Sequence, residues 1–383
     1  MRRARFFPAS GVLVRRPMLA AMVAAAALSA CAFGPDRPDP KPLEPIAAPI
    51  TVRPAWRESI GAVQFPLTVA VNGGTLSLAA SDGSVAALEA ESGRTIWRMN
   101  VGARISAGVG SDGNTAAVVT RDGDLVAIEA GQVKWKKPVG VRVATAPLVA
   151  GARVFVLGVD RTVHAFDAAD GVKLWQLQRP GDPLTLSQTG VIAAYKNTLV
   201  VGQGPRLAGV DPLTAALRWE VPVGSPRGAN EVERLADLIG PVLRSGELLC
   251  ARSFQAAVGC VDAERGAIVW TKAIGGTDAL GGDGELTFAA DASDRLTAWR
   301  TRTGDVVWTS EALMFRSLGT PAAIAGSVVV GDSSGMLHWL SRDKGEAQAR
   351  VGTDGSAISV PPVVVGGLLV VVTRSGGVFA FRP

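Results

Sequence analysis

The chain has 383 residues, of which 48% are hydrophobic and 19% are charged, so it can bury a large core and is not typical of a disordered protein. Its 39 basic and 34 acidic residues give a formal net charge of +5, which by itself would favour a nucleic-acid or acidic-membrane partner. The chain has only two histidines, which leaves little room for a histidine-rich metal centre.

The amino-terminal 30 residues have the pattern of an export signal. Five arginines and no acidic residue accompany an apolar run at 18–30, which is shorter than the roughly 20 residues that span a bilayer. The run ends in Leu28-Ser29-Ala30-Cys31, which resembles the bacterial lipobox. The resemblance implies cleavage before Cys31, acylation of its sulfur and new amino terminus, and, because Ala32 follows, sorting to the outer membrane. The alternative is an ordinary signal peptide with a chance cysteine after it.

Removal of this segment changes the charge argument. Residues 1–30 carry five of the 39 basic residues and no acid, so the mature chain has 34 residues of each sign and is neutral. A nucleic-acid partner therefore loses its main support. After Cys31 the chain has six prolines before residue 50, which predict an extended tether. We expect three parts: a signal peptide at 1–30, a lipidated cysteine and proline-rich tether at 31–50, and a folded domain at 51–383.

The folded domain is an internal repeat. Each unit has an apolar strand that ends near an acidic residue, then a glycine, then a tryptophan four positions later, as in Gly93 and Trp97. The tryptophan position recurs at intervals of 38, 40, 44, 51, 38 and 41 residues, close to the length of a β-propeller blade. In two degraded copies an alanine replaces the glycine (Ala215) or the tryptophan (Ala349). The tryptophan-equivalent positions are Trp97, Trp135, Trp175, Trp219, Trp270, Trp308 and Ala349.

The two ends of the repeat complete one further blade. Residues 378–382 form a third strand with no tryptophan strand after it, and Trp56 lies on a tryptophan strand with nothing before it. Joining them closes the ring and protects both edges. The sequence therefore predicts an all-β fold, an eight-bladed β-propeller of four-stranded blades whose amino-terminal strand joins the carboxy-terminal blade. The tryptophans are expected to pack against neighbouring blades; stacking on a cofactor is the alternative.

The two long intervals indicate where a partner could bind. Their extra residues follow Trp175 and Trp219, at equivalent connections in adjacent blades. Insertions on one face of a repeat protein often mark its binding face. The first insertion places two apolar side chains, Leu184 and Leu186, in a loop.

The second insertion, residues 225–238, has the spacing of a short capped helix. Asn230 and Glu233 fit a capping box. The alternative is a capped loop that meets only solvent. In the helical interpretation the inward side chains are Val232, Leu235 and Leu238, and those left for a partner or water are Glu231, Glu233, Arg234 and Asp237.

The repeat resembles the tryptophan-docking repeat of pyrroloquinoline-quinone dehydrogenases and lacks the marks of the WD40 type. The lipobox, the eight blades, the stretch 230–243 and the stretches 317–321 and 328–335 together resemble the BamB family of lipoproteins, over essentially the whole mature chain. This resemblance implies a non-enzymatic scaffold, lipid-anchored at the periplasmic face of the outer membrane, in the complex that folds and inserts β-barrel proteins. The implied partner is the central, BamA-like subunit. Other lipoproteins of the complex and unfolded outer-membrane proteins are further candidates.

The resemblance also implies contact residues. In the BamB family a Leu-x-Leu-Arg loop and the Asp-x-Asp end of the insert contact the central subunit. By position, Leu184 and Leu186 match the leucines and Asp237 matches the first aspartate. Ser187 stands where the arginine is expected and Ile239 where the second aspartate is expected. The apolar part of the contact is retained, and one charge of each sign is missing.

Two alternatives come from other functional classes. A quinone-dependent dehydrogenase would use an aspartate base, calcium ligands and often adjacent cysteines, but no two cysteines adjoin and no carboxylate cluster stands out beyond the acids at strand ends. We therefore assign no catalytic, cofactor-binding or metal-binding residue and expect no cofactor. His164 and His338 are expected to be packed or surface residues. An anchored propeller that binds a polysaccharide or a different envelope protein is the second alternative, against which the family-like insert argues.

Two cysteines remain besides Cys31. Cys250 and Cys260 are ten positions apart on consecutive strands of one blade. They can form a cross-strand disulfide in an oxidising periplasm if their Cα atoms lie within about 7 Å. Two buried free thiols are the alternative.

Overall fold

The computed structural model describes residues 1, 38–47, 49–179, 185–226 and 228–383. Its contacts divide the chain into Met1–Asp39 and Pro40–Pro383. Apart from Met1, the expected signal peptide and Cys31 lie outside the described residues. The described residues form 32 strands, and none of them belongs to a helix that is long and apolar enough to cross a membrane.

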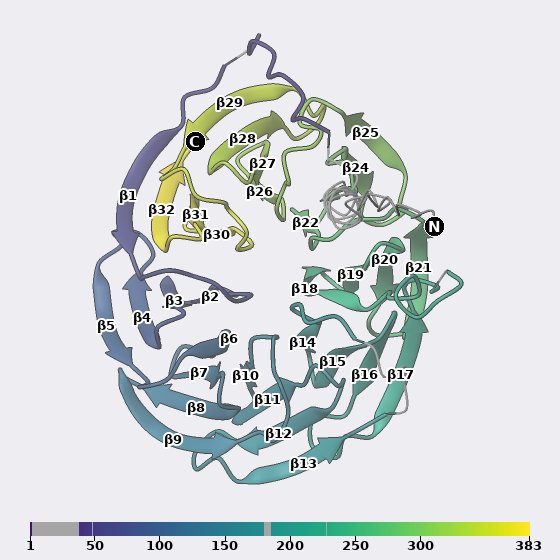
Figure 1. Cartoon of the computed structure of the whole chain (residues 1–383). Coiled ribbons are helices and arrows are strands. Elements are labelled where there is room, and N and C mark those ends of the chain that lie inside the picture. Colours follow the sequence, from purple (N-terminus) through teal and green to yellow (C-terminus); the bar gives the residue numbers. More distant parts are fainter. Residues whose placement is uncertain (2–37, 48, 180–184, 227) are drawn as a thin grey trace. The chain divides into compact units, whose positions relative to one another are not determined.

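The strands form eight antiparallel four-stranded sheets, arranged as blades around a ring (Figure 1). Blades 1 to 7 each use four consecutive strands, from the innermost to the outermost. Blade 1 contains β2 (Ala70–Asn72), β3 (Thr75–Ala79), β4 (Ser84–Glu89) and β5 (Thr95–Asn100). Blade 2 contains β6 (Ile105–Ser111), β7 (Thr115–Thr120), β8 (Asp124–Glu129) and β9 (Gln132–Pro138). Blade 3 contains β10 (Leu148–Ala150), β11 (Arg153–Leu157), β12 (Val163–Asp167) and β13 (Lys173–Leu177). Blade 4 contains β14 (Ile192–Tyr195), β15 (Thr198–Gln203), β16 (Arg206–Val210) and β17 (Leu217–Pro222).

The next three blades follow the same order. Blade 5 contains β18 (Leu238–Ser245), β19 (Leu248–Ser253), β20 (Ala257–Asp262) and β21 (Ala267–Lys272). Blade 6 contains β22 (Gly281–Gly282), β23 (Leu286–Ala290), β24 (Leu296–Arg300) and β25 (Val306–Ser310). Blade 7 contains β26 (Ala322–Ile324), β27 (Ser327–Gly331), β28 (Met336–Ser341) and β29 (Ala347–Gly352).

The eighth blade closes the ring and joins the two ends of the repeat. It contains β30 (Val363–Val365), β31 (Leu368–Val372), β32 (Gly377–Arg382) and β1 (Arg53–Ser59), which pairs antiparallel with β32 and places Trp56 opposite Ala380. The predicted eight-bladed propeller and its mode of closure are therefore confirmed.

Burial explains the two kinds of strand in each blade. The second and third strands lie between two neighbouring blades, so their side chains are buried on both faces and read as apolar runs, as in β31 with sequence LLVVV. The outermost strands have a solvent-exposed side and mix exposed with half-buried residues, as in β5. The core is therefore a ring of apolar layers between blades.

The antiparallel order gives the ring two different faces. Each strand reverses direction, so the hairpins between second and third strands share one face with the connections from each outermost strand to the next blade. We call this the connection face. The opposite face carries the other hairpins of each blade, and we call it the turn face.

Each outer-strand tryptophan docks on the next blade. The Nε1 of Trp270 donates to the carbonyl oxygen of Thr301 at 2.8 Å. A Cβ added at Gly304 would lie 2.6 Å from the Trp270 ring, and Gly304 has a φ of +72°, which explains why the repeat pairs glycine with tryptophan. The same bond joins other tryptophans to backbone oxygens of the next blade: Trp56 to Ala90, Trp135 to Ala168, Trp175 to Pro212, and Trp308 to Arg342.

The two degraded copies have separate physical explanations. Ala215 keeps the left-handed backbone of the glycine that it replaces, with a φ of +62°. Ala349 lies next to the closing blade, where β32 and β1 come from opposite ends of the chain and no hairpin exists for a tryptophan to dock on. Ile50 and Val52 instead pack against the apolar cluster that contains Ala349.

The geometry of Cys250 and Cys260 favours a disulfide over two free thiols. They are directly opposed on β19 and β20, their Cα atoms are 4.0 Å apart, and a disulfide joins them. We predict that denatured, unreduced protein has no thiol at these positions that reacts with an alkylating reagent. Replacing both by serine should cost about 2–3 kcal/mol of unfolding free energy, the loop-closure contribution for this spacing. Quantitative alkylation of both thiols without reductant would contradict the assignment.

Candidate functional site

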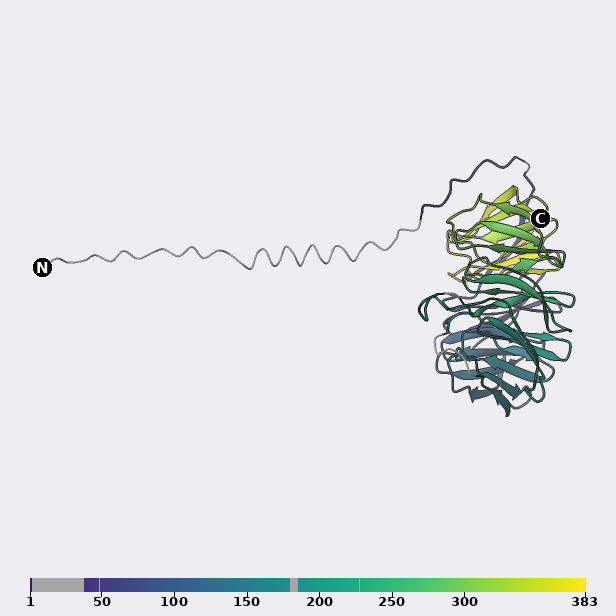
Figure 2. The ribbon, with the colours of Figure 1, turned by 90° about the vertical axis from the view of Figure 1, so that its right-hand side faces the viewer.

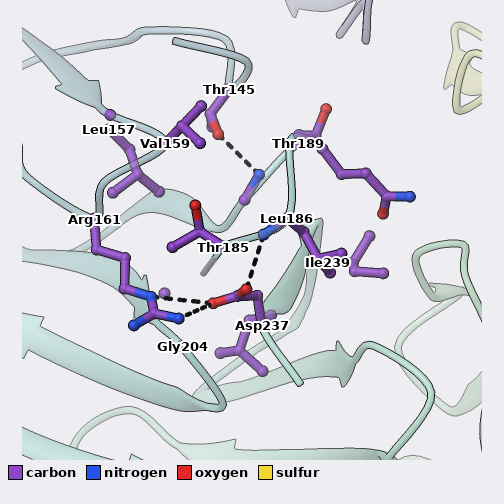
Figure 3. Close-up of a pocket in the computed structure, with 15 residues that line it drawn as sticks. Thr145, Leu157, Val159, Arg161, Thr185, Leu186, Thr189, Gly204, Asp237 and Ile239 are labelled. Carbon is purple, nitrogen blue, oxygen red and sulfur yellow. Dashed lines mark hydrogen bonds and ion pairs between the residues drawn. The ribbon is translucent and has the colours of Figure 1, made fainter. Parts of the chain in front are cut away.

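Three segments from neighbouring blades meet on the connection face around a small pocket of about 40 Å³ (Figure 3). One is the connection after β13, of which residues 178–179 and 185–191 are described. The second is the connection after β17, residues 223–237. The third is the hairpin between β11 and β12, which carries Arg161. The two insertions predicted to share one face therefore do meet.

Asp237 ties these segments together. Its Oδ1 accepts hydrogen bonds from Nε and Nη2 of Arg161, at 3.1 and 2.8 Å, and its Oδ2 accepts one from the backbone N–H of Leu186 at 3.1 Å. The two side chains of the ion pair are only 16% and 15% exposed. In this chain the carboxylate therefore holds the Leu186 loop in place, and its contact with a partner stays a prediction.

The same loop is fixed again at its carboxyl end. The backbone N–H of Gly190 donates to Oγ1 of Thr145 at 2.8 Å, and the carbonyl oxygen of Thr189 accepts from the N–H of Gly240 at 2.9 Å. Leu186 is half-buried and Ser187 is exposed. Leu184 lies outside the described residues. The structure thus presents the described part of the loop on a backbone anchored at both ends.

The second insertion forms the expected capping contacts on a turn and not on a helix. Oδ1 of Asn230 accepts from the backbone N–H of Glu233 at 2.9 Å, and Nδ2 of Asn230 donates to Oε1 of Glu233 at 2.8 Å. A single turn cannot bury three side chains on one face. Leu238 is buried and Leu235 half-buried, but Val232 is 68% exposed, contrary to prediction.

Charged side chains surround the junction on both sides. Arg234 is exposed and lines a hollow of about 240 Å³, together with Arg179 and Glu220. Arg179 pairs with Glu220 through Nη1 and Oε1 at 2.9 Å. Sequence reasoning missed both Arg161 and this pair, because their partners lie 76 and 41 positions away and no local pattern signals them.

The two departures from the family pattern have different surroundings. Ser187 lines a larger hollow of about 780 Å³ over blades 2 and 3, whose exposed side chains include Arg121 and Arg142. Exposed Asp122 lines the same hollow, so charges of both signs surround it, while Ser187 itself is neutral. Ile239 is buried in β18 opposite Arg252, so its side chain is part of the core.

The acids and histidines noted in the sequence have structural surroundings. Oδ1 of Asp262 accepts the backbone N–H groups of Glu264 and Arg265, each at 2.9 Å, and so caps the turn before the tryptophan strand. His164 and His338 are buried on the third strands of their blades. Within the described part of the chain, no group of three or more metal-ligating side chains could hold an ion.

A family model described as "Outer membrane protein assembly factor BamB" matches residues 81–310. The chain belongs to the BamB family. The BamB protein of Burkholderia pseudomallei is 34% identical to it over 378 residues, 97% of this chain and 99% of that protein. The name of these relatives is that of an assembly factor and not of an enzyme.

Solved structures agree on the fold. The crystal structure of BamB from Moraxella catarrhalis has a TM-score of 0.78 and 23% identity, and covers 87% of this chain and 100% of that chain. Quinohemoprotein alcohol dehydrogenase from Comamonas testosteroni has a TM-score of 0.66 at 15% identity, and covers 86% of this chain and 76% of that chain. The likeness to the dehydrogenase extends to the fold alone. Membership of the BamB family therefore favours an assembly-factor scaffold over a quinone-dependent dehydrogenase.

The Asp237 junction can be tested by breaking each partner. Asp237→Ala should speed hydrogen exchange of the Leu186 amide by about 10–100-fold, because a largely buried hydrogen bond and ion pair are lost. Arg161→Ala should have a smaller effect of the same kind, and the double variant should fall short of additivity by about 1–2 kcal/mol. Arg234→Ala, an exposed neighbour, is the matched control and should leave this amide unchanged. Additive effects, or unchanged exchange in Asp237→Ala, would show that the junction does not hold the loop.

His164 makes the fold sensitive to acid. Burial lowers the pKa of His164 to about 4, with Lys173 acting in the same direction and Asp160 opposing, and neither ring nitrogen has a hydrogen-bond partner among the described residues. The unfolded chain binds this proton from pH about 6.5 downward and the folded chain only near pH 4, so stability falls across that window as pH falls, by about 3 kcal/mol. His164→Leu should remove this part of the pH dependence in denaturant titrations. A parent and variant with the same slope would refute the assignment.

Proposed function

We propose that this protein is an outer-membrane protein assembly factor that works as a non-enzymatic scaffold. A lipid on Cys31 would hold it at the periplasmic face of the outer membrane. Its connection face would bind the central, BamA-like subunit through the Leu184–Leu186 loop and the neighbouring second insertion. The observation that carries this proposal is the fixed backbone of the Leu186 loop, built from the two long insertions in a chain of the BamB family.

The contact combines apolar side chains with a rim of charge. Leu184 and Leu186 supply the apolar part, and Leu186 already has its backbone bonded to Asp237. A loop held in its binding conformation loses less entropy on association, so affinity rises without additional contacts. Exposed side chains of both signs line the hollows around it, with Arg142 and Asp122 in one and Arg234 and Glu231 in the other. They would pair with complementary charges on the partner. Because the mature chain is neutral, it has no net electrostatic field that would attract a partner from a distance. Recognition must therefore come from the contacts of this loop region.

Lipid attachment would keep the propeller at the membrane. One acyl chain gives only marginal, reversible binding, whereas the several chains implied at Cys31 anchor a protein stably. The attachment needs the thiol of this cysteine, so Cys31→Ser should release the protein from the membrane without changing its fold.

Affinity purification from detergent-solubilised envelopes tests the proposal. A tagged, full-length protein should retain the central assembly subunit, together with other lipoproteins of the complex, and its mature amino-terminal peptide should carry acyl chains in mass spectrometry. Retention of a different envelope protein or of a polysaccharide in place of that subunit would favour the other anchored-propeller hypothesis. Unfolded outer-membrane proteins, added to the purified propeller, would show whether it also binds substrates.

A further inference from the structure

The chain before β1 is held against the outside of the ring. We call residues 40–52 the strap; all but residue 48 are described. Near its start, the N–H of Lys41 donates to the carbonyl oxygen of Met314 at 3.1 Å, and Nη2 of Arg316 donates to the carbonyl oxygen of Lys41 at 2.7 Å. Leu43 packs against the apolar cluster of blades 6 and 7. This part of the expected tether is therefore docked on the propeller.

The strap stays in contact along the outermost strand of blade 7. Nη2 of Arg350 donates to the carbonyl oxygen of Glu44 at 2.6 Å, and the N–H of Ile50 donates to the carbonyl oxygen of Gln348 at 3.1 Å. Between these points the strap arches over a cavity of about 620 Å³, lined also by β25, β28 and β29. Contacts at both ends fix the direction in which the strap runs.

That direction follows from the two faces. Met314 lies in the connection between β25 and β26, on the connection face, whereas Gln348 lies near the start of β29, toward the turn face. The strap therefore comes onto the ring from the connection face and runs beside β29 toward the turn face before it enters β1. Figure 2 shows the purple strap starting on the side of the ring from which the teal connection after β17 projects. The strap and the Leu186 junction thus share one face.

The length of chain before the strap limits how far this point can lie from the anchor. Eight residues lie between Cys31 and Pro40, and a fully extended chain across these positions spans at most about 30 Å. A propeller blade of five- or six-residue strands is about 20 Å from one face to the other. The reach exceeds the depth of a blade by only about 10 Å. Because the strap is docked, this limit applies to its start on the connection face and favours that face on the side of the anchor.

We propose that the docked strap orients the propeller, so that the connection face, with the Leu186 junction, is turned toward the membrane surface and the turn face points away. The central subunit would then meet the propeller on its membrane-facing side. This inference rests on the proposed acylation of Cys31 and goes beyond it by specifying which face of the propeller is turned toward the membrane. The docked strap sets this orientation, and the connection face then faces the lipid surface.

Energy transfer from matched labels on one blade tests this orientation. Ala292→Cys lies in the hairpin between β23 and β24 on the connection face, and Thr303→Cys lies in the hairpin between β24 and β25 on the turn face; both positions are exposed. The full-length acylated protein, with each label, is bound to phosphatidylethanolamine–phosphatidylglycerol vesicles that carry a headgroup acceptor. Transfer should be several times stronger from position 292. Equal transfer, or stronger transfer from position 303, would overturn the proposal.

Two variants separate the strap from the anchor. Twenty glycine and serine residues inserted after Asp39 leave the strap docked but lengthen the reach, and should reduce the difference between the two labels. Leu43→Asp should release the start of the strap and should also reduce the difference in energy transfer between the two labels. Melting curves check that this variant is folded. If Cys31 is not acylated, no label approaches the vesicles and the proposed anchoring itself fails. If the protein is acylated and retains the central subunit but the labels are equal, only the orientation is refuted.

Discussion

Replacing Leu184 and Leu186 together by aspartate is expected to abolish co-purification with the central assembly subunit. Each leucine that is buried at an interface contributes about 1.5–3 kcal/mol, and each aspartate would in addition place a charge in an apolar contact. The combined loss is expected to exceed a thousandfold in affinity. Because Leu186 is only half-buried in the free protein, the propeller should remain folded.

A matched substitution makes this result specific. Val306 is an apolar side chain at the start of the outermost strand of blade 6, 58% exposed, at the turn-face end of that strand and outside the segments that form the junction. Val306→Asp should leave co-purification unchanged, whereas Leu186→Asp alone should already weaken it. If the double variant melts like the parent and still retains the central subunit, the partner does not bind at this loop.

Trp270→Ala is expected to have the largest effect on stability among single substitutions at the blade seams. The ring is buried against blade 6, its Nε1 donates to the carbonyl oxygen of Thr301, and its face covers Gly304. Truncation leaves a cavity between blades 5 and 6 and an acceptor without its donor, at a cost of about 3–5 kcal/mol in unfolding free energy. Denaturant titration of the purified propeller measures this loss.

A phenylalanine at the same position separates packing from hydrogen bonding. Trp270→Phe keeps most of the buried area but no donor, so it should lose less than the alanine variant. A substitution on an exposed part of the same strand, Val269→Thr, should change stability by less than about 0.5 kcal/mol. If Trp270→Ala lost no more than this control, the tryptophan would not hold the blades together.

The architecture was accessible from the sequence because it is repeated. A tryptophan four positions after a glycine recurs in five of the eight blades, and the physical reason is the direct contact of the ring with the next blade's glycine turn. The closure of the ring followed from the third strand at 378–382, which lacks a following strand, and from Trp56, which lacks preceding ones. Even the missing tryptophan at Ala349 marks the one seam that no hairpin completes.

The details of the site were not accessible in the same way. The insertions and the capping contacts of Asn230 with Glu233 were predictable because their partners are close in sequence. The ion pair of Asp237 with Arg161 joins residues that are neighbours only after two blades have folded. The same limit explains why the strap was expected as an extended tether: its partners, such as Arg350, lie about 300 positions away.

Site-specific photo-crosslinking in intact cell envelopes tests the central claim most directly. A photoreactive residue is placed at Ser187 or at Arg234, which are exposed on either side of the junction, with Val306, at the turn-face end of β25, as the control position. Captured proteins are identified by mass spectrometry. The account predicts that the central barrel-assembly subunit is captured from positions 187 and 234 and not from position 306. Capture of a different envelope protein from the junction, with none of the central subunit, would contradict it.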